Sequence, residues 1–222
     1  MSSAKPHAGA ERQVSHSVFG RESARRFFPV FLVIALAVAF SLASTRFLQF
    51  NNLMIVAQQA VVLLVAALGM TFVVIAGSID LSVGAIVAIA ALVAAKTSGS
   101  IGVLAILPAC AIGVLCGLTN GSIVAKGKVP SFIVTLGAMV VYRGVVLYFT
   151  RGAPISIENE AFLDAYSGRT AGIPNSVLIA LVLIGVAAFM LNPTVFGREV
   201  RAIGGGERIA HLSGIQVAGR RS

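Results

Sequence analysis

The residues that could do chemistry in this sequence are a few polar side chains inside long apolar runs. Asp80 and Ser82 lie in the glycine-flanked stretch Gly77–Gly84. Gln58 and Gln59 can both donate and accept hydrogen bonds, as binding a neutral polar solute requires. Arg143 stands inside another apolar run, where an arginine costs about 2.5 to 3.5 kcal/mol. We take these five polar residues as candidates for a solute pathway: Gln58, Gln59, Asp80, Ser82 and Arg143.

Each of these residues also has a structural interpretation. Asp80 can accept backbone N–H groups at the start of a helix beginning at Leu81. The two glutamines can hydrogen-bond between helices, and Arg143 can extend toward the membrane surface or pair with another group. The sequence leaves these alternatives open.

Catalytic motifs are absent from the sequence. It contains no Gly-x-x-x-x-Gly-Lys-Ser/Thr phosphate loop, no His-Glu-x-x-His and no Gly-x-Ser-x-Gly. Cys110 and Cys116 have no His or carboxylate neighbours, so we interpret them as small packing residues. We expect no enzyme activity, no cofactor and no metal site, and any energy for work must come from a partner or a gradient.

The composition indicates an all-α integral membrane protein. Of 222 residues, 57% are apolar and 11% are charged. The net charge of +9 does not indicate nucleic-acid binding, because the basic residues lie at the chain ends and in short connections without interleaved aromatics. Six apolar runs predict about six transmembrane helices in contact with lipid: 27–43, 53–76, 81–95, 101–125, 131–150 and 174–191.

The charges predict that both chain ends face the cytoplasm. With the tail inside, twelve basic residues lie in cytoplasmic segments and four lie outside. We divide the chain into a cytoplasmic tail (1–26), a transmembrane helical domain (27–191) and a cytoplasmic C-terminal segment (192–222). The alternative for 27–43 is a cleaved signal peptide, but the run is longer than a usual signal core and more spans follow. The third run is short, so residues 77–84 are expected to enter the membrane as broken backbone.

The C-terminal segment after the sixth run predicts two short surface helices divided at Gly204–Gly206. Phe196, Val200 and Ile203 share one helix face, with Thr194 placed as an N-cap. Ile209 and Leu212 share a face of the second helix, which Gly214 would end. Such an amphipathic segment can dock a soluble partner, although a solvated loop is the alternative.

Three glycines in the fourth run form a ridge with four-residue spacing: Gly113, Gly117 and Gly121. Small residues with this spacing let another helix approach closely. We therefore predict a helix-packing role for this ridge.

Four stretches of the sequence follow one another in this order: Gly69–Gly84, which contains Asp-Leu-Ser-Val-Gly; Asn120-Gly with Lys128–Gly137; Tyr142-Arg-Gly; and Phe196-Gly-Arg with Ala202-Ile-Gly-Gly and Leu212-Ser-Gly-Ile. Together these stretches resemble the membrane permeases of bacterial ABC sugar importers of the ribose, xylose and arabinose type. The first is the most specific, and it separates the sugar type from the branched-chain amino acid permeases.

The resemblance implies a permease subunit in the bacterial inner membrane that translocates a monosaccharide. Its partners would be cytosolic ABC ATPase subunits, a periplasmic sugar-binding protein and a second permease copy, identical or related. The C-terminal segment would then be the part that couples to the ATPase, through these residues: Phe196, Gly197, Arg198, Gly204, Gly205, Glu207, Arg208, Leu212, Ser213 and Gly214.

The sequence departs from this family in two places. Gly206 stands where the family usually has Asn, and the chain stops at Ser222, whereas the family continues with further spans. We therefore expect a fragment or truncated product. Two alternatives remain: an ion-coupled secondary transporter using Asp80 and Arg143, and a membrane fragment that does not transport.

Overall fold

The computed structural model describes residues 11–192 and 194–205, with side chains from Phe27 onward. The chain divides into two compact units, residues 1–55 and 56–222, and α2 crosses the boundary. The elements in order are α1 (Glu11–Ala43), α2 (Phe50–Ile75), α3 (Val83–Ile101), η1 (Gly102–Ala105), α4 (Ile106–Gly127), α5 (Ser131–Thr150), α6 (Glu160–Ser167), β1 (Arg169–Thr170), β2 (Ile173–Pro174), α7 (Asn175–Leu191) and α8 (Val195–Gly204).

The first unit is α1 followed by a short turn. Helix α1 begins at Glu11, inside the segment predicted as a tail, and its apolar part is Phe27–Ala43. The rings of Phe40 and Phe47 stack across the turn with centroids 5.6 Å apart. Asn52 Nδ2 donates to the Phe47 carbonyl at 2.9 Å and fixes the start of α2.

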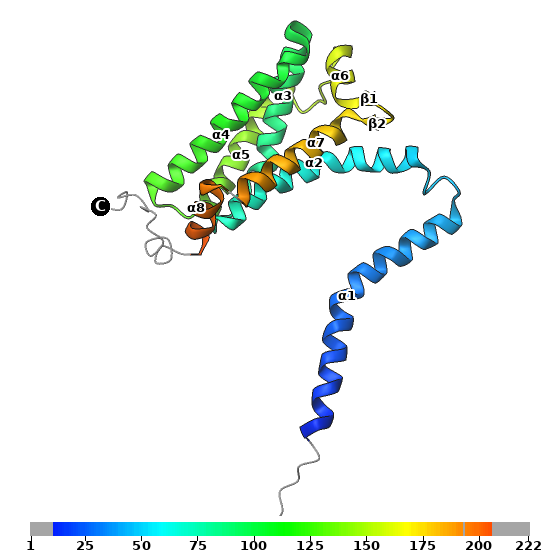
Figure 1. The fold of residues 1–222 in the computed structure, drawn as a ribbon. Coiled ribbons are helices and arrows are strands. Elements are labelled where there is room, and N and C mark those ends of the chain that lie inside the picture. The colour runs from blue at the N-terminus through cyan, green and yellow to red at the C-terminus, as the bar shows by residue number, and fades with distance from the viewer. Residues whose placement is uncertain (1–10, 193, 206–222) are drawn as a thin grey trace, which may run out of the picture. The chain divides into compact units, whose positions relative to one another are not determined.

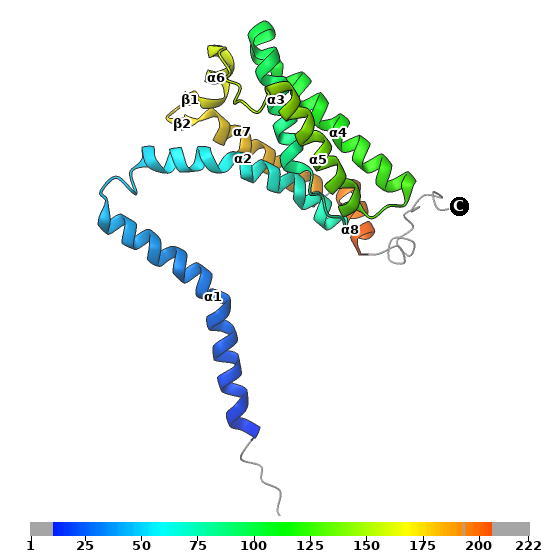
Figure 2. The same cartoon turned by 180° about the vertical axis from the view of Figure 1, so that it is seen from behind.

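The second unit is built around α3, α4 and α5, which pack against one another (Figures 1 and 2). Their contacts bury mainly small residues, which let helices approach closely where lipid provides no hydrophobic driving force. Most large apolar side chains point outward instead, as a lipid-facing surface requires. The buried residues of these helices include Ala85, Leu92, Ala94, Ala109 and Cys116.

Three continuous helical stretches in the described residues are long and apolar enough to cross a membrane, or four if α7 and α8 form one bent span. One of them, Val83–Gly127, runs over α3, η1 and α4. It folds back on itself, because Ser82 Oγ, just before α3, lies 2.9 Å from Asn120 Nδ2 near the end of α4. Helices α3 and α4 are about 28 and 33 Å long, so each is long enough to cross the bilayer once. The predicted all-α, multi-pass class is confirmed, while the count of six spans and their orientation stay predictions.

The third predicted run was placed wrongly at both ends. Helix α3 begins at Val83 rather than Leu81 and continues to Ile101, so it is not a short span. Residues 96–100, predicted as a loop, extend the helix because their hydroxyls bond to its own carbonyls. Thr97 Oγ1 donates to Val93 O and Ser98 Oγ to Ala95 O. The helix stops at Gly102, whose φ of 58° favours glycine.

A small hairpin joins α6 to α7 beyond the far end of this bundle. Strand β1 pairs antiparallel with β2, and the turn residues Ala171 and Gly172 both have positive φ, as a two-residue hairpin turn requires. Asn159 caps α6 by accepting from Phe162 N at 2.9 Å. These elements cover the end of the bundle opposite the α2–α3 loop (Figure 1).

Candidate functional site

The α2–α3 loop, residues 76–82, begins with a glycine that ends α2. Gly77 has a φ of 74°, and its N–H donates to Val74 O at 3.0 Å. Ser78 N donates to Val73 O at 3.0 Å. This pair of bonds is a Schellman motif, which satisfies the last carbonyls of a helix and turns the chain away from its axis. The backbone before α3 is therefore broken as predicted, up to Ser82 rather than Gly84, while its entry into the membrane stays a prediction.

Two hydroxyls of α5 hold this loop in place. Ser131 Oγ accepts from Ile79 N at 3.1 Å, and Thr135 Oγ1 accepts from Leu81 N at 3.1 Å. Thr135 is buried one turn into α5, so it reaches the loop from inside the bundle. These two hydroxyls give the nonhelical backbone of the loop hydrogen-bond partners that a helix would otherwise supply.

Asp80 fixes the start of α3, but not as its N-cap. Its Oδ1 accepts from Ser82 N at 2.7 Å and from Ser82 Oγ at 2.6 Å. Ser82 itself occupies the N-cap position, and its side chain makes no cap bond. The prediction that Asp80 caps a helix at Leu81 is therefore wrong by two residues, because the carboxylate folds over its own loop and orients the capping residue.

A chain of hydrogen bonds runs from Asp80 across three helices, and we call it the polar chain: Tyr142, Asn120, Ser82 and Asp80. Tyr142 Oη lies 2.9 Å from Asn120 Oδ1, and Asn120 Nδ2 lies 2.9 Å from Ser82 Oγ. The Ser82 hydroxyl donates to Asp80 Oδ1 and accepts from the Asn120 amide. The amide oxygen then faces the Tyr142 hydroxyl. Every donor points toward Asp80, which polarises and strengthens the chain.

Sequence reasoning missed most partners of this cluster. Asn120, Ser131, Thr135 and Tyr142 lie in the stretches that carry the family resemblance, yet none was singled out as a site residue. A lone Asn in an apolar run was the available signal, because a buried amide needs a partner. Nothing in the sequence pairs it with Ser82, which is separated from it by a whole helical hairpin.

Helix α8 confirms that the first of the two predicted short helices forms, while its place on the membrane surface stays a prediction. Thr194 is its N-cap, accepting from Gly197 N at 3.1 Å and donating to Met190 O. Val200 is buried, and the Phe196 ring lies 6.1 Å from that of Phe72 on α2. A Cβ at Gly197 would overlap the carbonyl of Leu191, so only glycine allows α8 to turn this closely from α7.

The end of α8 lies directly on the α2–α3 loop. A Cβ at Gly204 would overlap the carbonyl of Ile75, and one at Gly77 would lie 3.5 Å from Gly204 Cα. The two segments therefore meet backbone to backbone. Along α8, apolar and charged residues are exposed: Val195 (59%), Phe196 (45%), Arg198, Glu199 and Ile203 (50%). We call these five residues the docking surface.

The rest of the predicted coupling segment lies outside the described residues. Gly205 follows α8 directly. The second short helix and its residues fall beyond it: Glu207, Arg208, Ile209, Leu212, Ser213 and Gly214.

The other predicted pathway residues are not brought into the polar chain. Gln58 is half-buried and Gln59 is exposed, both on α2. Arg143 is exposed on α5, next to Tyr142. Within residues 27–192 and 194–205 these three side chains form no hydrogen bond. Their role in a pathway stays a prediction.

The glycine ridge of α4 divides into a covered part and an open part. A Cβ at Gly113 would lie 3.9 Å from the Ile86 side chain of α3, whereas Gly117 and Gly121 have nothing within 4 Å. The last two line a shallow pocket of about 240 Å³. Gly113 therefore faces α3, and close packing of another helix on the open part stays a prediction.

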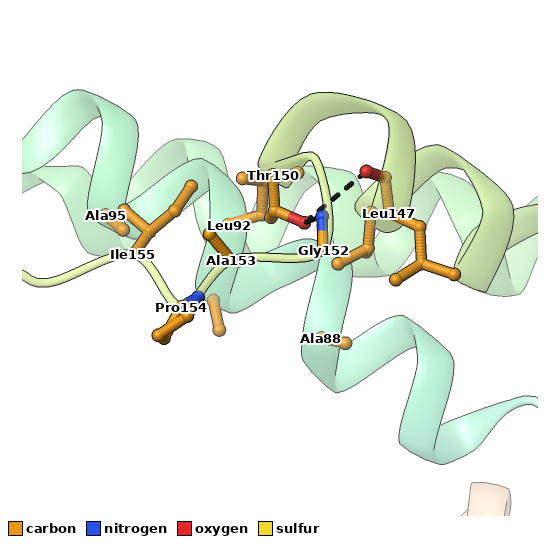
Figure 3. A pocket seen from close by; sticks show the side chains of 11 residues that line it. Ala88, Leu92, Ala95, Leu147, Thr150, Gly152, Ala153, Pro154 and Ile155 are labelled. Atoms are coloured by element: carbon orange, nitrogen blue, oxygen red, sulfur yellow. Dashed lines mark hydrogen bonds between the residues drawn. The ribbon is translucent and has the colours of Figure 1, made fainter.

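A larger pocket of about 520 Å³ lies between the middle of α3 and the last turns of α5. Figure 3 shows the chain from Gly152 to Ile155 passing over the alanines of α3. Gly152 N donates to Thr150 Oγ1 at 3.1 Å, which holds this segment to α5. The lining is mostly apolar: Ala88, Ala91, Leu92, Ala95, Val146, Leu147, Thr150, Gly152, Ala153, Pro154 and Ile155.

Comparisons with known proteins identify a family over most of the chain. Residues 52–221 match the family described as branched-chain amino acid transport system / permease component. The ribose import permease protein of Escherichia coli (strain K12) is 38% identical over 194 residues, covering 83% of this chain and 60% of that protein. That of Bacillus subtilis (strain 168) is 39% identical over 193 residues, covering 85% and 60%.

The L-arabinose ABC transporter permease protein of Azospirillum brasilense is 37% identical over 153 residues, covering 68% of this chain and 45% of that protein. The chain thus spans about 60% of the length of the ribose permeases it matches. No solved structure matches it.

The matched region contains all four stretches that carried the resemblance in the sequence. The family description refers to amino acids, while these relatives of 37 to 39% identity are named for sugars. The resemblance to permeases of ABC sugar importers is thereby confirmed. This chain belongs to the permease-component family of such transport systems, and it is a multi-pass helical protein of the bacterial inner membrane.

Proposed function

We propose that this chain is the membrane permease subunit of an ATP-driven importer of a monosaccharide. The observation that carries the proposal is the identity of 36 to 39% to permeases named for ribose, over more than four fifths of the chain. In this proposal a cytosolic ABC ATPase hydrolyses ATP and a periplasmic sugar-binding protein delivers the solute. A second permease copy completes the pathway.

The docking surface of α8 is the proposed contact with the ATPase. It combines exposed apolar side chains with neighbouring charges, which suits a partner that buries the former and pairs with the latter. An isolated surface helix in water would gain nothing from exposing Val195 and Ile203. Glu207 and Arg208, on the adjoining segment, are included in the proposed contact.

The polar residues in the membrane form the proposed pathway in two groups. Gln58, Gln59 and Arg143 have side chains without hydrogen bonds in the described part of the chain, so they can bond a passing hydroxyl at no cost in internal bonds. Asp80 and Ser82 already bond to each other. To contact a solute, these two side chains must exchange the bond between them for bonds to the solute during transport.

Uptake of radiolabelled ribose into proteoliposomes tests the proposal. The chain is reconstituted with its cognate ATPase and with a periplasmic ribose-binding protein, and ATP is supplied on the ATPase side. Uptake that requires both ATP and the ATPase supports an importer subunit. Uptake that an uncoupler abolishes, without dependence on ATP, would instead identify an ion-coupled transporter. Absence of uptake, with the ATPase bound, would indicate a fragment that does not transport.

A pair of matched variants tests the docking surface separately. Ile203→Glu places a carboxylate in the proposed contact, and we expect it to lower ATPase recovery in a pull-down at least tenfold. Leu163→Glu makes the same change on α6, at an exposed apolar residue on the opposite end of the bundle. Equal ATPase recovery with both variants would contradict the docking role of α8.

A further inference from the structure

The contact between α8 and the α2–α3 loop is stiff. Gly204 and Ile75 are in contact through backbone atoms, and Gly77 also lies against the backbone of Gly204. No flexible side chain lies between them that could absorb a displacement. Figure 2 shows α8 beside the loop at the end of α2, at the edge of the α3–α5 bundle. Any movement of α8 toward this edge must therefore move the loop.

The other end of the loop is tied to all three helices of the bundle. Thr135 and Ser131 hold it to α5, and Asp80 holds the first residue before α3. The polar chain then continues through Asn120 of α4 to Tyr142 of α5. A loop fixed in this way cannot shift without breaking bonds or carrying the helix ends with it.

The polar chain behaves as a single unit because its central groups are buried. Ser82 is 0% exposed, Asn120 5% and Thr135 4%, so water cannot replace a lost partner. If Ser82 turns away, the Asn120 amide loses its acceptor and Asp80 loses two donors. A buried unpaired group is costly, and the arrangement therefore favours a fully bonded state or a wholly rearranged one. Two-state elements of this kind turn a small displacement into a discrete change.

We propose that the α2–α3 loop and the polar chain transmit movement of α8 to helices α3, α4 and α5, with Asn120 as the central positioning residue. The inference rests on the proposed function only for the origin of the movement, which is closure of the ATPase against the docking surface. Pressure on Gly204 displaces the loop, the bond between Ser82 and Asn120 breaks, and α4 separates from α3 at this end. Movement of α8 thereby separates the three helices or brings them together.

A native thiol reports on this rearrangement. Cys116 is buried, 6% exposed, one turn before Asn120 on α4, and its carbonyl lies 3.3 Å from Tyr142 Oη. Cys110 is exposed. The variant Cys110→Ser therefore leaves one thiol, whose rate of labelling by a small membrane-permeant reagent measures how often α4 separates from its neighbours.

The first experiment measures this labelling rate in the Cys110→Ser chain without any ATPase. Gly204→Val forces α8 off the loop, and we expect labelling of Cys116 to rise about fivefold, the shift that follows loss of one neutral hydrogen bond. Gly69→Val is the matched control, because the same change on α2 enters open space. Tyr142→Phe, which removes the end of the polar chain, should raise the rate similarly, whereas Tyr148→Phe, at an exposed position of the same helix, should not.

Each result decides the proposal. Faster labelling in Gly204→Val and Tyr142→Phe, with both controls at the parental rate, supports it. Faster labelling in Tyr142→Phe alone would show that α8 is not linked to the polar chain, and a parental rate in both would show that the chain does not hold α4. If circular dichroism shows that Gly204→Val is unfolded, the labelling rate is measured in Phe196→Ala instead. This variant removes the contact with Phe72 and introduces no steric overlap. A parental rate in that variant would overturn the proposal.

The second experiment adds the ATPase with and without nucleotide. A bound ATPase that changes Cys116 labelling when ATP is added supports transmission through α8. An ATPase that binds in a pull-down but leaves the rate unchanged in every nucleotide state would overturn the inference while leaving the proposed function intact. An ATPase that does not bind would contradict the proposed function, and the first experiment would still stand.

Discussion

Helices α3 and α5 meet at the two ends of α5, and the two regions of contact are built in opposite ways. Beside the α2–α3 loop they are joined through Thr135, Asp80 and the polar chain. At the end of α5, beside the middle of α3, they line a mostly apolar pocket of about 520 Å³ to which α3 contributes three alanines (Figure 3); we call this region the alanine end. The same two helices are thus held by directed bonds at one end and by loose apolar contact at the other.

This difference shows how the bundle can be fixed and adaptable at once. Hydrogen bonds fix distance, direction and rotation of each helix, because a misplaced donor loses its partner. Contacts between alanine side chains fix little more than the distance between two helices, since each side chain is a single methyl group. A helix tied at one end and given space at the other can tilt about the tied end, and the experiments below test each end in turn.

The largest effect is expected at the polar end from Asn120→Leu. The new side chain has similar size but forms no hydrogen bond, so the Ser82 and Tyr142 hydroxyls each lose their bond to Asn120. We expect a loss of about 1 to 3 kcal/mol in the free energy of unfolding, measured by denaturation in mixed micelles. Thr119→Val, the neighbouring residue exposed on α4, is the control and should change little. A loss no larger than that of the control would show that the bonds of Asn120 do not stabilise the polar end.

Larger side chains at two alanines of α3 can distinguish the polar end from the alanine end. Ala85 is buried one turn after Ser82, at the polar end. Ala85→Leu adds three carbon atoms where the helices cannot move apart without breaking the polar chain. We expect a loss of about 1 to 3 kcal/mol in the free energy of unfolding. A neutral result would mean that the helices separate freely here, contrary to the tied arrangement.

A smaller effect is expected from removing one hydroxyl of the polar chain. Tyr142→Phe keeps the ring and loses the bond to Asn120, and we expect a loss of about 0.5 to 1.5 kcal/mol. Tyr148→Phe makes the same change at an exposed ring of α5 and should stay within about 0.5 kcal/mol of the parent. A double-mutant cycle with Asn120→Leu should be non-additive, because both changes remove the same bond. Strict additivity would contradict a direct interaction.

The helices were largely predictable from the sequence, because long apolar runs leave few alternatives in a membrane. The predicted run 131–150 coincides with α5, and 174–191 differs from α7 by one residue. Errors arose where polar residues carry their own hydrogen bonds. Thr97 and Ser98 bond back to their own helix, so a polar stretch that reads as a loop continued α3 by a turn.

The site was predictable only in part, because its residues are joined by contacts across the fold. Asp80 and Ser82 were both among the pathway candidates, and they bond to each other because they lie two residues apart in a glycine-flanked loop; their role in a pathway stays a prediction. Their partner Asn120 could not be assigned, because helix periodicity does not tell which turn of α4 faces the start of α3. The contact of Gly204 with Ile75 was equally hidden, since glycine leaves no side-chain pattern to interpret.

The smallest effect is expected at the alanine end, from Ala88→Leu. Ala88 lies one turn after Ala85 on α3 but lines the pocket, so the added carbon atoms enter open space and displace no helix. We expect the free energy of unfolding to stay within about 0.5 kcal/mol of the parent in the same micelle titration, in contrast to Ala85→Leu. If Ala88→Leu is as costly as Ala85→Leu, the pocket is closed in the folded protein and both ends of α3 are equally tight. A neutral Ala88→Leu beside a costly Ala85→Leu places the change from tied to adaptable packing within a single turn of one helix.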